Sequence, residues 1–230
     1  MTEEGGQMTR RWIGPVVIAA MLVFTAVVYS SLPERIPTHW NVRGDVDGWS
    51  SRLWGALLAP LVSAGVWVLL PVLRRMDPRR RNYDRFEPTF WLLVNLLIVF
   101  FAGLHVMTLG VALGWAIDMT RAILVTVGLV IAVLGNYLPR LRSNWWLGIR
   151  TPWTLESDAV WRSTHRLAGY TFVIGGLATA ASALLPSPVA IGVAMVAIMT
   201  AAIAPAIYSY VAYQRERREA EQPDSSSRLT

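Results

Sequence analysis

The chain has 230 residues, of which 54% are hydrophobic and only 16% are charged. This balance excludes an ordinary soluble domain and favours a membrane protein. The lack of cysteine excludes disulfides, thiolate metal sites and thiol nucleophiles. The formal charge of +6 raises the alternative of a nucleic-acid partner, which the positions of the basic residues test.

Six apolar runs are long enough to cross a hydrocarbon core of ~30 Å. In chain order they are residues 12–31, 53–73, 89–113, 121–138, 167–185 and 189–213. Together they use more than half of the chain, so no large soluble domain remains. The sequence therefore predicts an all-α, polytopic bundle of six transmembrane helices in the cell membrane.

The basic residues are unevenly distributed between the loops. All 21 are arginine, and if the N-terminus is cytoplasmic only Arg35, Arg43, Arg52 and Arg121 fall outside. The positive-inside rule accounts for this distribution, so we expect both termini in the cytoplasm and no nucleic-acid partner.

This topology divides the chain into four parts. Residues 1–11 are expected to be a cytoplasmic N-terminus, and residues 12–120 an N-terminal membrane region with an extracytoplasmic loop at 32–52. A second membrane region follows at 121–213, with a cytoplasmic loop at 139–166. Residues 214–230 are polar and charged and are expected to be a disordered cytoplasmic tail.

The outer loop, residues 32–52, is rich in proline and glycine, which oppose a continuous helix. We expect a short extended piece at residues 36–41. Asn41, Asp45 and Asp47 could supply oxygen ligands to a calcium ion, but these residue types also close tight turns, and the loop lacks the distal glutamate of a calcium loop. The turn interpretation is favoured, and no metal site is predicted.

Two further features carry open alternatives. The arginine-rich loop from Arg74 to Arg85 is explained by topology, although a juxtamembrane basic segment can also bind anionic lipid. His105 lies near the centre of the third run, where an ionisable residue is a functional hypothesis. A neutral histidine that bonds across helices is the structural alternative.

Most of the available chemistry lies in the stretch from Gly135 to Tyr170, which holds five arginines, four tryptophans and two prolines. It cannot cross a bilayer and must lie at its edge. Arg150, between Trp146 and Trp153, could grip a phosphate or carboxylate, stack on an aromatic ring, or bond free carbonyls at a helix end. Thr154 is expected to cap an amphipathic helix that leads into the fifth run.

The spacing of this stretch closely resembles the signature of the SdpI family of bacterial membrane proteins. The matching residues include Gly135, Arg166 and Gly169, together with the predicted ligand- or partner-binding residues Asn136, Asn144, Gly148, Arg150, Thr151, Pro152, Trp153 and Trp161. A second segment, LPERIPTHWNVRGDVDG at residues 32–48, resembles the short domain of unknown function that often precedes the SdpI segment.

The resemblance implies an immunity or sensing protein that gives tolerance to a membrane-active peptide toxin. It implies two candidate partners besides the bilayer: the peptide and a cytoplasmic regulator. Catalytic groups that could act together are not found, so we expect no enzyme, catalytic residue or cofactor. The alternative is a small transporter or lipid-interacting protein. Small residues on the last two runs are compatible with a homo-oligomer and with packing inside one bundle.

Overall fold

A computed structural model describes residues 3–221 of the chain. The α-helices are α1 Glu3–Val28, α2 Arg52–Met76, α3 Glu87–Ala112, α4 Met119–Tyr137, α5 Pro152–Glu156, α6 Asp158–Ser182 and α7 Ser187–Glu221. Short 3-10 helices are η1 Tyr29–Ser31, η2 Arg80–Arg85 and η3 Leu138–Arg140. One hairpin pairs β1 Arg35–Trp40 with β2 Val46–Ser51.

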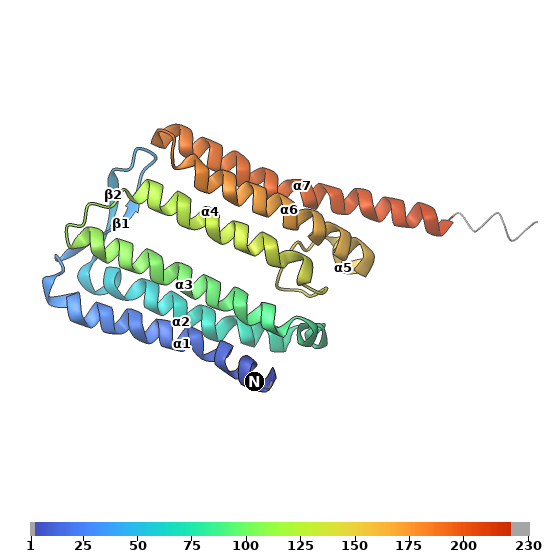
Figure 1. The fold of residues 1–230 in the computed structure, drawn as a ribbon, viewed down its shortest axis with the longest axis horizontal. Helices are drawn as coiled ribbons and strands as arrows, with labels where there is room; N and C mark the ends of the chain where they lie inside the picture. Colours follow the sequence, from blue (N-terminus) through green and yellow to red (C-terminus); the bar gives the residue numbers. More distant parts are fainter. Residues whose placement is uncertain (1–2, 222–230) are drawn as a thin grey trace, which may run out of the picture.

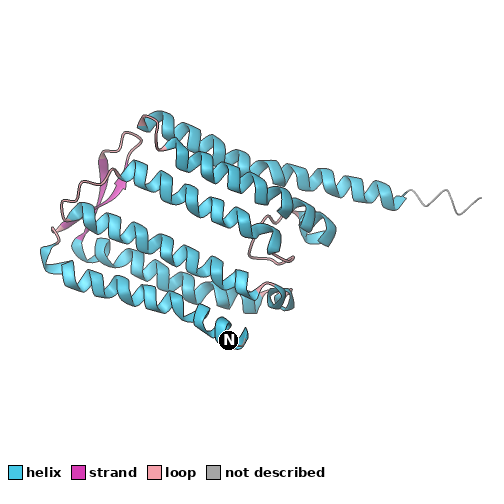
Figure 2. Cartoon of the chain, in the orientation of Figure 1, coloured by secondary structure: helices cyan, strands magenta, loops and turns pink. Residues whose placement is uncertain are grey.

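The long helices lie side by side and alternate in direction (Figure 1). The hairpin and the α3–α4 and α6–α7 turns lie at one end, and η2, α5 and the start of α1 lie at the other. Apart from the hairpin, all regular secondary structure of the described residues is helical (Figure 2). The predicted all-α polytopic fold is therefore confirmed.

Five helices have the length and hydropathy of membrane spans: α1, α2, α3, α4 with η3, and α7. The remaining long helix, α6, covers the expected fifth run up to Ser182 but begins nine residues earlier, at Asp158, with two arginines and a histidine in its first turns. These residues keep α6 below the hydropathy of the other spans. The count of six spans and the cytoplasmic termini therefore stay predictions.

The helices form two groups of three. In the first, α3 packs against both α1 and α2, and in the second, α6 packs against both α4 and α7. Contacts between α3 and α4, which join the groups, are much less extensive. The largest buried apolar cluster lies between the groups and includes Tyr83, Phe90, Leu138, Leu141 and Trp161.

Glycine allows α4 and α6 to approach closely. A Cβ added at Gly128 would lie 2.5 Å from the carbonyl oxygen of Gly176, and one at Gly176 would lie 2.4 Å from the amide nitrogen of Ala132. Two helical turns away along both helices, Gly135 and Gly169 form a similar contact. Small residues let backbones meet in this way in lipid, where burial of apolar side chains gives little driving force. The small-residue face of α6 is thus used within one chain.

The proline- and glycine-rich loop at residues 32–52 contains more regular structure than expected. The extended piece is strand β1, and it pairs antiparallel with β2. The side-chain Oδ1 of Asn41 accepts from the amides of Arg43 (2.8 Å) and Asp45 (3.1 Å), and Gly44 has a φ of 89°. Asn41 therefore closes the turn, as the favoured interpretation predicted.

Two boundaries differ from expectation. The first helix already begins at Glu3, inside the expected polar N-terminus. Helix α7 continues to Glu221, so residues 214–221, expected to be disordered, are helical. The rest of the predicted tail, residues 222–230, lies outside the described residues.

Candidate functional site

The central loop, residues 138–157, connects α4 to α6 through η3 and α5. It lies at the arginine-rich end of the bundle, beside η2 (Figure 1). Hydrogen bonds from individual side chains hold its shape.

Asn144 organises the first turn of the central loop. Its Oδ1 accepts from the amides of Trp146 (2.9 Å) and Leu147 (2.7 Å), while its Nδ2 donates to the carbonyls of Arg142 (2.9 Å) and Leu147 (3.1 Å). The side chain is completely buried. Only an amide side chain both donates and accepts in this way, so aspartate could not replace it without losing bonds.

Asp77 joins this turn to the other half of the molecule. Its Oδ2 accepts from the amide of Trp145 (2.9 Å) and from the hydroxyl of Tyr83 (2.9 Å), and its Oδ1 accepts from the amide of Arg79 (2.7 Å). The Tyr83 hydroxyl also lies 3.1 Å from Asn144 Oδ1. Burial, together with the hydrogen bond to Asp77, raises the pKa of Tyr83 well above its ordinary value, so the phenol stays protonated and donates.

The arginine-rich loop makes further contacts with the central loop. The Arg79 guanidinium donates to Ser143 Oγ and to the Leu155 carbonyl, and Asn82 Nδ2 donates to the Ser143 carbonyl at 2.7 Å. Arg74 pairs with Asp84 (3.0 Å) and Glu87 (3.3 Å). At least two of the arginines in this loop therefore have structural roles besides any effect on topology.

His165 supports the second turn of the loop from α6. Its Nε2 accepts from the Ile149 amide (3.0 Å), so Nδ1 carries the proton and donates to the Trp161 carbonyl (2.9 Å). Gly148, with a φ of 96°, leaves room for the ring, since a Cβ there would lie 2.3 Å from Nε2. Burial lowers the pKa of His165 from 6.5 to about 4, so the ring is neutral at physiological pH.

The helix caps differ from those predicted. Thr151, and not Thr154, is the N-cap of α5, and the two threonines form a capping box. Ser157 caps α6 by accepting from the amides of Ala159 and Val160. Pro152 is the first residue of α5, and the extended backbone of Ser157 separates the expected single helix into α5 and α6. Thr151 Oγ1 also lies 2.9 Å from Ser209 Oγ on α7, which fixes the loop to the last helix.

An exposed edge remains on the ordered loop; we call it the Trp–Arg edge and define it as Trp145, Trp146 and Arg150. The two indoles are 48% and 38% exposed. Arg150 is also exposed, and its guanidinium donates to the Trp145 carbonyl at 2.7 Å. Arg150 therefore bonds a carbonyl of the loop and not, as predicted, one at a helix end, and its guanidinium stays exposed.

The predicted ligand-binding residues thus occupy three environments. Asn144 and Trp161 are buried and hold the loop together, with the Trp161 indole donating to the Leu141 carbonyl at 3.0 Å. A second set is half-buried at the joints of the loop: Gly148, Thr151 and Trp153, whose ring lies 5.0 Å from that of Tyr210. The exposed set is Arg150, Pro152 and Asn136, and Asn136 stands apart on the last turns of α4.

Sequence reasoning missed the residues that secure the loop from outside it. Asp77, Tyr83 and Asn82 lie 61 to 68 residues before their partners, and Ser209 lies 58 residues after its partner. His165 carried a signal, because it lies one turn after Trp161 on the predicted amphipathic helix. For Asp77 the only signal was an acidic residue at the start of an arginine-rich loop.

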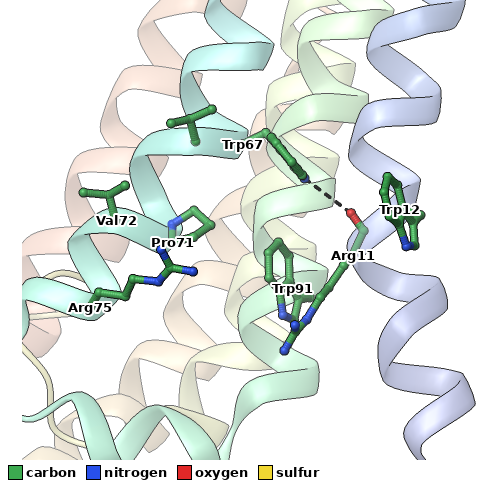
Figure 3. A pocket seen from close by; sticks show the side chains of 8 residues that line it. Arg11, Trp12, Trp67, Pro71, Val72, Arg75 and Trp91 are labelled. Atoms are coloured by element: carbon green, nitrogen blue, oxygen red, sulfur yellow. Dashed lines mark hydrogen bonds between the residues drawn. The ribbon is translucent and has the colours of Figure 1, made fainter.

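His105 and one further pocket lie away from the central loop. His105 is buried, and its Nε2 lies 2.9 Å from Thr25 Oγ1 on α1, which is a bond across helices. A pocket of about 540 Å³ lies between α1, α2 and α3, with Arg75 extending toward Trp91 (Figure 3). Within residues 3–221, no three His, Asp or Glu side chains are arranged to hold a metal ion.

Comparisons with known proteins agree with the two segments singled out in the sequence. The SdpI/YfhL protein family matches residues 140–209, and a domain of unknown function, DUF1648, matches residues 16–64. The chain is 23% identical over 208 residues to "Immunity protein SdpI" of Bacillus subtilis (strain 168), covering 90% of this chain and 98% of that protein. No solved structure matches. The chain is therefore a multi-pass cell-membrane protein that is similar to the SdpI/YfhL protein family over residues 140–209 and to DUF1648 over residues 16–64.

Proposed function

We propose that this protein is a non-catalytic immunity protein that gives its cell tolerance to a membrane-active peptide toxin. The observation that supports the proposal most strongly is the similarity to an immunity protein over 90% of this chain and 98% of the relative. Similarity over this length includes both helix groups and the arginine-rich loop that contacts the central loop, and so extends well beyond the family segment.

The Trp–Arg edge is the recognition surface in this proposal. Indole rings supply a large, rigid contact area, and an outward guanidinium adds charge-assisted donors. The backbone beneath is already ordered, because the Trp145 amide is held by Asp77 and its carbonyl by Arg150. A ligand therefore gains these contacts without the entropic cost of ordering the loop.

The ligand at this edge is the toxin peptide or a cytoplasmic regulator. A peptide that inserts into the bilayer reaches interfacial tryptophans from the lipid side, whereas a soluble regulator reaches them from the cytoplasm. The two ligands therefore approach the Trp–Arg edge from different sides, and direct binding measurements show which of them binds.

A tolerance assay tests the proposal. The wild-type protein is expressed in a host sensitive to a membrane-active peptide, alongside Trp146→Ala and Arg150→Gln, with membrane protein levels matched. Wild type should raise the inhibitory peptide concentration severalfold, and each variant should lose most of that gain. Arg121→Gln removes an exposed arginine from the opposite end of the bundle and is the matched control.

The outcomes are decisive in either direction. If wild type confers no tolerance to any peptide in a panel of membrane-active toxins, the immunity role is wrong. If tolerance persists in both edge variants, the role stands but the Trp–Arg edge is not the recognition surface. Binding of labelled peptide to the purified protein in nanodiscs, compared with a regulator pull-down, then identifies the ligand.

A further inference from the structure

We propose that a cavity between α1, α3 and the end of α4 binds the headgroup of an anionic phospholipid with free hydroxyls, of the phosphatidylglycerol type. The cavity has a volume of about 310 Å³. It is lined by Arg10, Ile13, Pro88, Thr89, Leu92, Asn95, Tyr137 and Arg140. Arg140 lies at the start of the central loop, but none of the lining residues takes part in the hydrogen bonds described above for that loop. The inference does not depend on the proposed function.

The charge of the cavity fits a phosphate. Two arginines line it and no carboxylate does. Arg10 makes one long bond, 3.4 Å to the Pro88 carbonyl, and the Arg140 guanidinium lies 4.5 Å from the centre of the Tyr137 ring. Among the side chains that the structure describes, those of residues 10–221, neither arginine forms an ion pair. Both guanidinium groups therefore keep donors for an anion, in the geometry that suits phosphate.

The neighbouring pocket shows the contrast (Figure 3). There Arg11 also points toward the arginine-rich end, but it pairs with Glu87 at 2.8 Å and lies over the Trp91 ring. Glu87 also accepts from Arg74. A carboxylate already serves as the anion for Arg11, whereas the cavity beside Arg10 contains none.

Asn95 supplies the second, independent observation. It is only 7% exposed, and its Nδ2 donates to the Arg10 carbonyl at 2.8 Å. Its Oδ1 is buried with no hydrogen-bond partner in the described part of the chain. A buried acceptor without a donor is costly. Asn95 lines the cavity, and in this proposal a small movement of its side chain brings Oδ1 to a headgroup hydroxyl. Phosphatidylglycerol carries both the phosphate and the hydroxyls.

The depth of the cavity suits a lipid bound by its headgroup. Arg10 lies two residues before the apolar run at 12–31, and Arg140 lies two residues after the run at 121–138. The cavity therefore lies where the hydrocarbon region ends, and Ile13, which is 41% exposed, offers apolar contact on the membrane side. Basic pockets between helices at this depth are typical sites for anionic headgroups.

The test uses the purified, delipidated full chain in a neutral detergent. Binding of short-chain phosphatidylglycerol, phosphatidylcholine and phosphatidic acid is measured by native mass spectrometry and by the shift in unfolding temperature. Wild type should prefer phosphatidylglycerol to phosphatidylcholine by about tenfold or more. Arg10→Gln and Arg140→Gln should each weaken phosphatidylglycerol binding by about fivefold, the effect expected of one arginine near the membrane surface.

Two variants control for charge and for the hydroxyl contact. Arg75→Gln removes the same charge from the pocket of Figure 3 and should leave phosphatidylglycerol binding unchanged. Asn95→Leu should reduce the preference for phosphatidylglycerol over phosphatidic acid, which lacks the headgroup glycerol. Because Asn95 also holds the Arg10 backbone, its unfolding temperature without lipid is compared with that of wild type.

Three results would overturn the inference. Equal binding of phosphatidylglycerol and phosphatidylcholine would show that no anion site exists. An equal loss in Arg75→Gln would show that the binding follows diffuse surface charge. Competition by free glycerol phosphate at the same concentration as the lipid would show a soluble phosphate-ester site and exclude the lipid.

Discussion

Single residues of the central loop are held in ways that permit little substitution, and Gly148 is the most restricted. Its backbone lies in the left-handed region, and a side chain there would occupy the position of the His165 ring. We expect Gly148→Ala to lower the unfolding temperature in detergent by roughly 5–10 °C, because strain and steric overlap act together. Gly103→Ala is the control, since a Cβ at Gly103 meets nothing within 4 Å. Equal shifts for both variants would contradict this account.

The buried imidazole of His165 makes stability depend on pH. Because its pKa is lowered from 6.5 to about 4 in the folded state, only the unfolded chain takes up the proton between these values. Stability is therefore full above pH 6.5, falls as the pH falls toward 4, and has decreased by about 2 kcal/mol at pH 5.

Unfolding measurements at about pH 7.5 and about pH 5 check this expectation. In His165→Asn the drop between the two pH values should shrink, even though the variant is less stable at both. A drop of unchanged size in His165→Asn would assign the pH dependence to another group.

At the scale of elements, the fold depends on the contact between α4 and α6. Gly128 and Gly176 place the two backbones so close that a side chain at either position meets backbone atoms. We expect Gly176→Leu to separate the helices and to lower the unfolding temperature by several degrees, which corresponds to overpacking of roughly 1–3 kcal/mol. Gly192→Leu on α7, where a Cβ meets nothing within 4 Å, should have little effect.

The long helices could be predicted from the sequence because apolar length is a local signal. Helices α2 and α7 contain their predicted runs, and α1, α3 and α4 end within three residues of the ends of theirs. The cap of α5 was missed, since Thr151 and Thr154 are equally good caps by residue type. The division into α5 and α6 was missed as well, because Ser157 is another such residue inside the expected single helix.

The central loop was correctly identified as a special segment, but its supports were not predictable. The Asp77 carboxylate and the Tyr83 hydroxyl meet the loop only after the two intervening helices α3 and α4 have been packed. Separation along the chain gives no indication of such a meeting, and arginine-rich loops are common for reasons of topology alone. The cavity beside Asn95 is likewise formed by three helices and has no local pattern.

For the whole molecule, the main expectation is the orientation in the membrane. The chain contains no cysteine, so single cysteines can be introduced without background. With Val42→Cys in the hairpin and Arg162→Cys at the start of α6, an impermeant thiol reagent should label only the first in intact cells. Both should react after permeabilisation. Labelling of Arg162→Cys in intact cells would reverse the predicted topology and move the Trp–Arg edge outside.

The bond from the Trp145 amide to Asp77 also limits how the chain can be divided. Asp77 lies outside both family-matched segments, 16–64 and 140–209, yet it accepts a hydrogen bond from inside the second. A chimera that joins residues 140–209 to the first helices of a different protein would leave the Trp145 amide without a hydrogen-bond acceptor, unless that protein supplied one at the same place. Modular exchange within this architecture therefore has to keep the α2–α3 connection with the segment it supports.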